Sequence, residues 1–141
     1  MRPSLLLVLL PSLALAGDVD PASLYRLSTA GSTAQLRPGQ KGTVVVEIQS
    51  LQGAHVSDEA PLKLTLAGTG SVTPGQTTLA YPDSVRKKSE AVKYPDPRFE
   101  VPITATGSGP GTVEAKLTFF ICSAELCLRQ QKTLTVPVRV E

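Results

Sequence analysis

The feature that most constrains this chain is a two-residue alternation of apolar and polar side chains, repeated between closely spaced glycines and prolines. It is clearest over residues 112–121, where every odd-numbered residue from Val113 to Ile121 is apolar and most of the residues between them are polar. Successive side chains of a β-strand point to opposite faces, so this period predicts strands with one buried and one exposed face. No stretch repeats apolar residues at the spacing of a helix face. The sequence therefore predicts an all-β fold.

Five segments show the alternation clearly and three show it weakly. The clear segments are residues 42–49, 62–66, 99–105, 112–121 and 133–140. The weaker ones are residues 23–29, 33–36 and 77–81. Breaks rich in Gly and Pro separate these short segments, and this arrangement predicts a β-sandwich of about seven to nine antiparallel strands. Pro102 and Pro137 fall in the polar phase, which predicts edge positions or bulges because proline cannot donate to a strand ladder.

A long polar segment, residues 81–97, interrupts this pattern and is bounded by prolines. It is predicted to be a loop, and loops of this length in compact domains are commonly functional or mobile. The basic run Arg86-Lys87-Lys88 inside it is short. We interpret this run as a solvated face of the loop.

The first sixteen residues have the layout of a secretory signal peptide: a basic start at Arg2, an apolar centre and an Ala14-Leu15-Ala16 cleavage signal. The apolar stretch from Leu5 to Ala16 is 12 residues long, whereas a membrane-spanning helix needs about 20. We therefore expect cleavage after Ala16 and a mature chain without a membrane span. Residues 17–141 are expected to form a single exported domain.

Composition argues against several classes of function. Lys and Arg number 14 against 12 Asp and Glu, so the charge balance indicates no nucleic-acid or anionic-membrane partner. Zinc sites use three or four Cys or His ligands, and the chain has two cysteines and one histidine. We expect no metal site and no cofactor. His55 stands outside any hydrolase motif and is interpreted as a structural or exposed residue.

The two cysteines, Cys122 and Cys127, are separated by four residues between the two strongest strand segments. A four-residue connection is an ordinary hairpin loop. Directly opposed residues have Cα atoms about 4.5 to 5.5 Å apart, which is within disulfide range. The parity of each strand places its cysteine on the outer face. Gln130 and Lys132 occupy the inward phase of the second strand, so either that strand leaves the core or a bulge turns Cys127 to the other face.

The position of such a bond leaves two functions open. A ring of six residues stabilises a fold by only about 2 kcal/mol, against about 4.7 for a 100-residue loop. The hairpin tip is thus a poor place for a staple and a suitable place for an exchangeable disulfide. Arg129, on the face of Cys127, would favour a thiolate, and Glu125 would oppose it. The alternative is a non-catalytic binding or scaffold domain with a structural hairpin disulfide.

Several short motifs resemble, in their order along the chain, the N-terminal periplasmic domain of DsbD-type thiol:disulfide interchange proteins. The likeness extends over most of the chain, from about Gly42 to Val140. The motifs are Gly53-Ala54-His55-Val56, Ala60-Pro61-Leu62-Lys63-Leu64, Tyr81-Pro82, Phe99-Glu100-Val101-Pro102-Ile103, Gly111-Thr112-Val113, Phe119-Phe120-Ile121-Cys122, Cys127 and Lys132-Thr133-Leu134-Thr135-Val136-Pro137.

This resemblance implies an immunoglobulin-like β-sandwich in which Cys122 and Cys127 cycle between dithiol and disulfide. It implies a periplasmic location and two kinds of partner. A thioredoxin-like or membrane electron-transfer protein would supply electrons, and periplasmic oxidoreductases would receive them. A loop over the cysteine pair would correspond to residues 81–88, although the aromatic residues expected around Ser84-Val85-Arg86 are absent.

Overall fold

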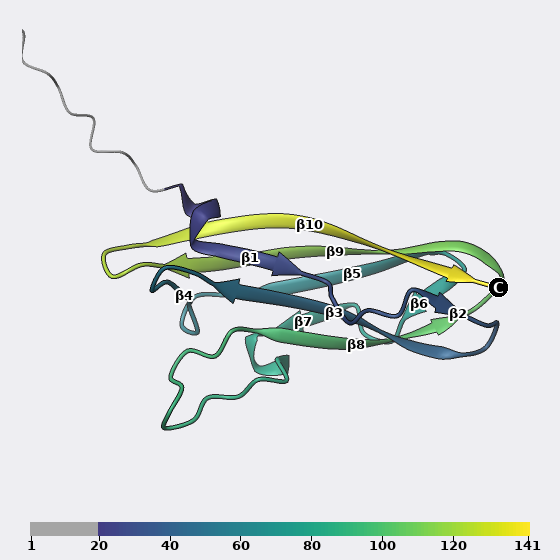
Figure 1. Ribbon diagram of the computed structural model, residues 1–141, viewed down its shortest axis with the longest axis horizontal. Coiled ribbons are helices and arrows are strands. Elements are labelled where there is room, and N and C mark those ends of the chain that lie inside the picture. Colours follow the sequence, from purple (N-terminus) through teal and green to yellow (C-terminus); the bar gives the residue numbers. More distant parts are fainter. Residues whose placement is uncertain (1–19) are drawn as a thin grey trace, which may run out of the picture.

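The computed structural model describes residues 20–141, and the predicted signal peptide, residues 1–16, lies outside the described residues. The described chain is almost entirely β-structure (Figure 1). Its strands are β1 (Tyr25–Ser28), β2 (Gln35–Leu36), β3 (Lys41–Ser50), β4 (His55–Val56), β5 (Lys63–Gly70), β6 (Val72–Pro74), β7 (Thr78–Ala80), β8 (Arg98–Ala105), β9 (Gly109–Cys122) and β10 (Cys127–Val140). Two short 3₁₀ turns, η1 (Pro21–Leu24) and η2 (Tyr81–Asp83), precede β1 and follow β7.

The strands form two sheets, which confirms the predicted all-β sandwich. One sheet has the order β1-β3-β8-β6, and the other has the order β2-β10-β9-β5-β7 with β4 paired to β9. All pairs are antiparallel except β2 with β10, which is parallel. The described residues contain ten strands, more than the expected number. Two of them, β4 and β6, lie outside the eight predicted segments and are two and three residues long.

The core lies between the two sheets and is built from the apolar phase of each strand. All five predicted segments contribute inward-facing residues that are fully or almost fully buried. They include Val44, Val46 and Ile48 of β3, Leu64 and Leu66 of β5, Phe99, Val101 and Ile103 of β8, Val113, Ala115, Leu117, Phe119 and Ile121 of β9, and Val136, Val138 and Val140 of β10. Burial of one face per strand is the physical reason for the period of two.

The β9–β10 hairpin is regular along its whole length. Register runs without interruption from Cys127 opposite Cys122 to Val140 opposite Gly109. No bulge resets the parity, so the strand leaves the core instead. Lys132 is exposed, and the Gln130 side chain accepts a 3.0 Å hydrogen bond from the hydroxyl of Tyr25 in β1.

Pro137 lies at a locally unpaired edge, as predicted, but Pro102 lies on β8, an interior strand between β3 and β6. The Pro102 carbonyl accepts a 2.7 Å hydrogen bond from the Gly75 amide, so the backbone of Pro102 faces the side of β8 that lies beyond the last residue of β6. Pro137 faces the outer edge of β10, away from β9.

The long loop after η2, the tip of the β9–β10 hairpin and β4 lie toward the same end of the molecule (Figure 1). The carboxyl terminus lies at the opposite end. Within residues 20–141, no helix has the length and apolar character needed to cross a membrane.

Candidate functional site

The two cysteines form a disulfide between directly opposed residues of β9 and β10. Their Cα atoms are 4.0 Å apart, and Cys127 is the register partner of Cys122. Beyond them the turn is closed by a 2.9 Å hydrogen bond from the Ser123 amide to the Leu126 carbonyl. The Ser123 hydroxyl also accepts hydrogen bonds from the amides of Glu125 and Leu126, at 3.3 Å each. The pairing expected from spacing and parity is therefore confirmed.

The two halves of the disulfide differ sharply in exposure. Cys122 is buried, with 2% of its surface exposed, whereas Cys127 is exposed. Both occupy the outward phase of their strands. The difference arises because β9 has neighbours on both sides at this level, β10 and β4, while β10 has β9 on one side only. An approaching molecule therefore meets Cys127 before Cys122.

His55 of β4 lies across from Cys122 in register, so its side chain is on the same face of the sheet as the disulfide. The row formed by Cys127, Cys122 and His55 therefore crosses three strands. The imidazole stacks on the ring of Tyr94 from the long loop, with ring centroids 4.0 Å apart and an angle of 23° between the ring planes. The sequence interpretation of His55 as a structural or exposed residue did not include this neighbourhood.

The long loop is fastened at both of its ends. Near its carboxyl end, the Asp96 carboxylate accepts hydrogen bonds from the amide and hydroxyl of Ser50, at 3.2 and 2.7 Å. The Tyr81 hydroxyl donates to the Pro95 carbonyl at 3.1 Å. The Ser84 hydroxyl accepts from the Arg98 amide at 3.0 Å. These contacts hold residues 84–97 against the end of the sandwich.

The basic run within the loop is exposed, but each of its three residues has a partner within the chain. Arg86 forms a 2.8 Å ion pair with Glu47 of β3. Lys87 donates to the Pro82 carbonyl at 2.5 Å, and Lys88 pairs with Asp58. Arg86 therefore ties the loop to β3, and Lys88 ties it to the segment that follows β4.

Glu47 is the electrostatic centre of this attachment. Its side chain is nearly buried between Arg86 and Arg98, and the second ion pair measures 2.9 Å. Burial opposes ionisation of the carboxyl, but the hydrogen bonds from Arg86 and Arg98 outweigh it and lower the pKa of Glu47 below its ordinary value. Glu47 is thus ionised at neutral pH and holds the beginning of the loop on β3.

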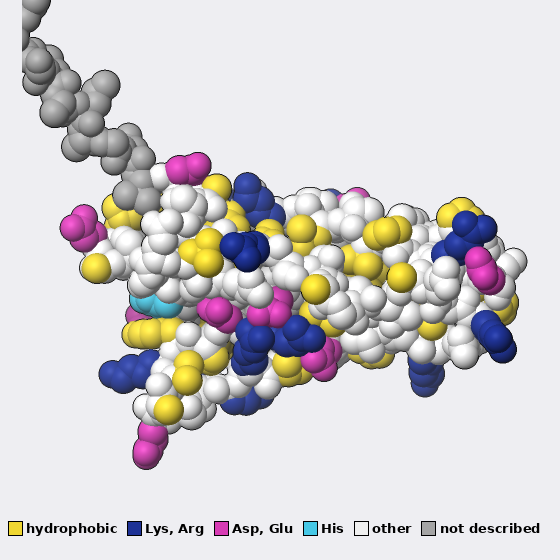
Figure 2. All heavy atoms as spheres, viewed as in Figure 1, with side chains coloured by type: hydrophobic (Ala, Val, Ile, Leu, Met, Phe, Trp, Pro, Cys, Tyr) yellow, Lys and Arg dark blue, Asp and Glu magenta, His cyan; other side chains and the backbone are white. Residues whose placement is uncertain are grey.

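The end of the molecule that carries the disulfide also carries large exposed apolar side chains. Leu126, at the hairpin tip next to Cys127, is 51% exposed, and Val85, Val92 and Tyr94 of the loop are each nearly half exposed. Figure 2 shows hydrophobic and charged side chains gathered together at this end. The aromatic residue of the loop that lies beside the disulfide row is Tyr94, which falls outside the segment 81–88 implied by the resemblance.

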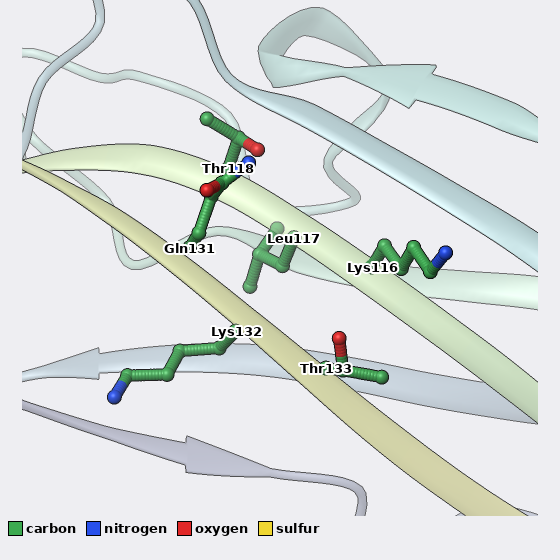
Figure 3. A pocket seen from close by; sticks show the side chains of 6 residues that line it. All are labelled: Lys116, Leu117, Thr118, Gln131, Lys132 and Thr133. Carbon is green, nitrogen blue, oxygen red and sulfur yellow. The ribbon is translucent and has the colours of Figure 1, made fainter.

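Hollows elsewhere on the described surface lack comparable chemistry. One, of about 230 Å³, lies over β9 and β10 and is lined by Lys116, Leu117, Thr118, Gln131, Lys132 and Thr133. The two lysine side chains extend away from each other (Figure 3), and the lining has no cysteine, histidine or carboxylate. Among residues 20–141, no three His, Cys, Asp or Glu side chains lie close enough together to hold a metal ion.

Comparison of the chain with models of known protein families found no match, and comparison with curated proteins found none either.

Proposed function

We propose that this protein is an exported thiol–disulfide exchange module that passes reducing equivalents through Cys122 and Cys127. The observation that carries the proposal is the disulfide across the hairpin tip, with Cys127 exposed and Cys122 buried. Exchange needs an accessible sulfur and a retained second thiol, and this pair supplies both. The ordered motifs that resemble the DsbD N-terminal domain support the same assignment and a periplasmic location.

The exchange step follows from the difference in exposure. A thiolate of a partner dithiol attacks the Cys127 sulfur, the Cys122–Cys127 bond breaks, and Cys122 leaves as a thiolate that takes up a proton. The second thiol of the partner then attacks the partner's sulfur in the mixed disulfide, and Cys127 is released as a thiol. The partner dithiol is oxidised to a disulfide, and the module is reduced to a dithiol. Reversal of these steps on an oxidised protein passes the two electrons on.

The surroundings of the pair support a protein partner. Leu126 and Tyr94 offer exposed apolar surface on two different elements close to the disulfide, and protein interfaces are enriched in aromatic and other apolar anchors at their centre. A thioredoxin-like or membrane electron-transfer protein would donate the electrons, and periplasmic oxidoreductases would receive them. Neither nucleic acid nor a metal cofactor takes part in this scheme.

The experiment that tests this function is the trapping of a mixed disulfide. In the Cys122→Ser variant, Cys127 has no resolving thiol, so an attached partner stays attached. The partner is a purified thioredoxin-like protein whose resolving cysteine has been replaced and whose remaining thiol is first converted to a mixed disulfide with thionitrobenzoate. We expect the Cys127 thiolate to attack this disulfide, release thionitrobenzoate and form a protein adduct that disappears on reduction.

The matched control is Cys127→Ser, in which only the buried Cys122 remains. It should form at least tenfold less adduct under the same conditions. Equal amounts of adduct with the two variants would contradict the proposal that the partner thiolate attacks Cys127 first. Absence of an adduct with Cys122→Ser would favour the alternative, a non-catalytic domain with a structural hairpin disulfide.

A further inference from the structure

The last strand has a long unpaired edge. All of β10 pairs with β9 on one side, but on its other side β2 pairs only with Arg139 and Val140. Within residues 20–141, no strand pairs with that side between Cys127 and Val138. Figure 1 shows β10 along the border of the molecule, with η1 near its beginning and β2 at its end.

The alternating direction of the backbone hydrogen bonds along β10 identifies which residues present their N–H and C=O groups on this edge. The Arg139 amide donates to the Ala34 carbonyl at 2.8 Å, and peptide groups of alternate residues face alternate sides of a strand. The odd-numbered residues of β10 therefore direct their N–H and C=O groups away from β9. Between the hairpin tip and Pro137, all of these residues are exposed: Cys127, Arg129, Gln131, Thr133 and Thr135.

One group on this edge already has a partner. The Arg129 carbonyl accepts a 2.8 Å hydrogen bond from the side-chain amide of Gln130. Pro137 ends the array of donors because it has no N–H. The edge therefore offers a defined segment from Arg129 to Thr135. Such an edge is a template for an added strand.

The charge of the edge selects the occupant. β10 contains no acidic residue, and the unpaired segment carries Arg129 on its outer face and Lys132 on its inner face. Lys132 opposes pairing with a second copy of the same edge, because the inward-pointing lysines of the two copies would meet there. A second copy pairing antiparallel through the same segment would gather two arginines and two lysines at one junction, and like charges across a strand pair are destabilising. A segment whose carboxylates lie on its outer face would instead pair with Arg129.

We propose that the edge of β10 binds an extended acidic segment of a partner protein, which adds to the sheet as a further strand. Main-chain hydrogen bonds to the odd-numbered residues would provide affinity, and side chains at alternate positions would provide specificity. Carboxylates on one face of the segment would meet Arg129, and apolar residues on the other would meet Leu128 and Leu134, which are half-buried. This inference concerns the backbone edge and does not depend on exchange at the disulfide.

The test uses the disulfide-bonded protein and a synthetic eight-residue peptide with blocked ends in which glutamate alternates with valine. Amide hydrogen exchange is followed by NMR with and without the peptide. We expect exchange at least tenfold slower at Arg129, Gln131, Thr133 and Thr135, and no change at the even-numbered amides, which already pair with β9. A peptide in which lysine alternates with valine should leave all of them unchanged.

Two variants separate edge pairing from general attraction. Thr133→Pro removes one outward N–H and leaves the ladder to β9 intact, as Pro137 already does, and we expect at least tenfold weaker peptide binding. Thr133→Val keeps the N–H and should bind like the wild type. If Thr133→Pro does not fold, Arg129→Glu provides the same test, because it should reverse the preference between the glutamate and lysine peptides.

Three results would overturn the inference. One is an absence of protection at the four odd-numbered amides when the glutamate peptide is present in excess. A second is peptide binding by Thr133→Pro at the level of Thr133→Val. A third is a dimer in sedimentation whose odd-numbered amides are protected before any peptide is added, because a second copy would then be the occupant.

Discussion

At the scale of single residues, the two cysteines have identical chemistry and different surroundings. Cys122 lies on a strand with neighbours on both sides, and Cys127 lies on the unpaired side of the hairpin. A thiol reacts with an electrophile only when it is reachable and deprotonated. In the exchange that we propose, burial makes Cys127 the sulfur that is approached and Cys122 the one that leaves.

This assignment predicts unequal alkylation of the single-cysteine variants. Cys122→Ser, which retains the exposed Cys127, should react with iodoacetamide at least tenfold faster than Cys127→Ser, which retains a cysteine that is 2% exposed. Mass spectrometry of timed samples measures both rates, and reaction in denaturant provides the control because the two rates should converge there. Similar rates in the folded proteins would contradict the assignment.

Glu47 predicts a pH-dependent contribution to stability. Its pKa is lowered in the folded protein, so its contribution is fully present above the unfolded value of 4.5 and is lost as the pH falls through the folded value. Glu47→Gln removes the carboxylate that pairs with Arg86 and one of the two that pair with Arg98, which keeps Glu100 at 3.0 Å. It should lower the free energy of unfolding at pH 7 by about 2 kcal/mol. Below the folded pKa the two proteins should converge.

Denaturant unfolding of both proteins at a series of pH values measures this difference. Glu114→Gln is the control, because Glu114 is half exposed and pairs with Lys116 at 3.6 Å, so its removal should change stability by a few tenths of a kcal/mol. A difference between wild type and Glu47→Gln that stays constant down to acidic pH would contradict the ion-pair explanation.

At the scale of elements, the turn between β5 and β6 carries the chain from one sheet to the other. Gly70 adopts φ 70°, and a Cβ on it would lie 2.5 Å from the Pro110 carbonyl oxygen. Gly70→Ala should therefore lower the free energy of unfolding by about 3 kcal/mol. Gly39→Ala separates backbone strain from the steric clash, because Gly39 also has a positive φ, 83°, but open space around it. The free energy of unfolding of Gly39→Ala should fall by about 1 kcal/mol. Equal decreases for Gly39→Ala and Gly70→Ala, measured by thermal or denaturant unfolding, would contradict the steric explanation.

The long loop predicts a kinetic effect at the disulfide. The Tyr94 ring covers His55 on the row that contains Cys122, so Tyr94→Ala should open that side to small reductants. We expect dithiothreitol to reduce the disulfide severalfold faster, as measured by the release of free thiols over time. Val92→Ala removes an equally exposed side chain of the same loop and should leave the rate unchanged. Equal rates for Tyr94→Ala and wild type would show that the stack does not limit access.

Some strands and some features of the site were predictable from the sequence, and others were not. Period two encodes which face of a strand is buried, and this is why the five clear strands, the parity of Cys127 and the pairing of the cysteines were predictable. β4 and β6 were not, because they have only two and three residues and, unlike the equally short β2 and β7, do not lie within a longer segment that shows the alternation. The burial of Cys122 and the stacking of Tyr94 on His55 depend on β4 and on the long loop, which meet β9 only in the folded chain.

At the scale of the whole molecule, the sandwich is stabilised by a core that extends along both sheets, and the disulfide lies at one end of it. The fold does not need this bond as a staple, because a ring of six residues contributes about 2 kcal/mol at most. Cys122→Ser should therefore remain folded, with a free energy of unfolding lower by that amount, as measured by denaturant unfolding. Loss of the folded state would indicate that the bond is primarily structural.

The proposed function requires that the Cys122–Cys127 bond is exchanged and is not permanent. Equilibration of the protein in glutathione or dithiothreitol buffers of defined potential, followed by quantification of free thiols, measures its reduction potential directly. The proposed function predicts a potential between about −300 and −120 mV, the range of proteins that exchange disulfides. A potential well below about −300 mV, where structural disulfides lie, would contradict it.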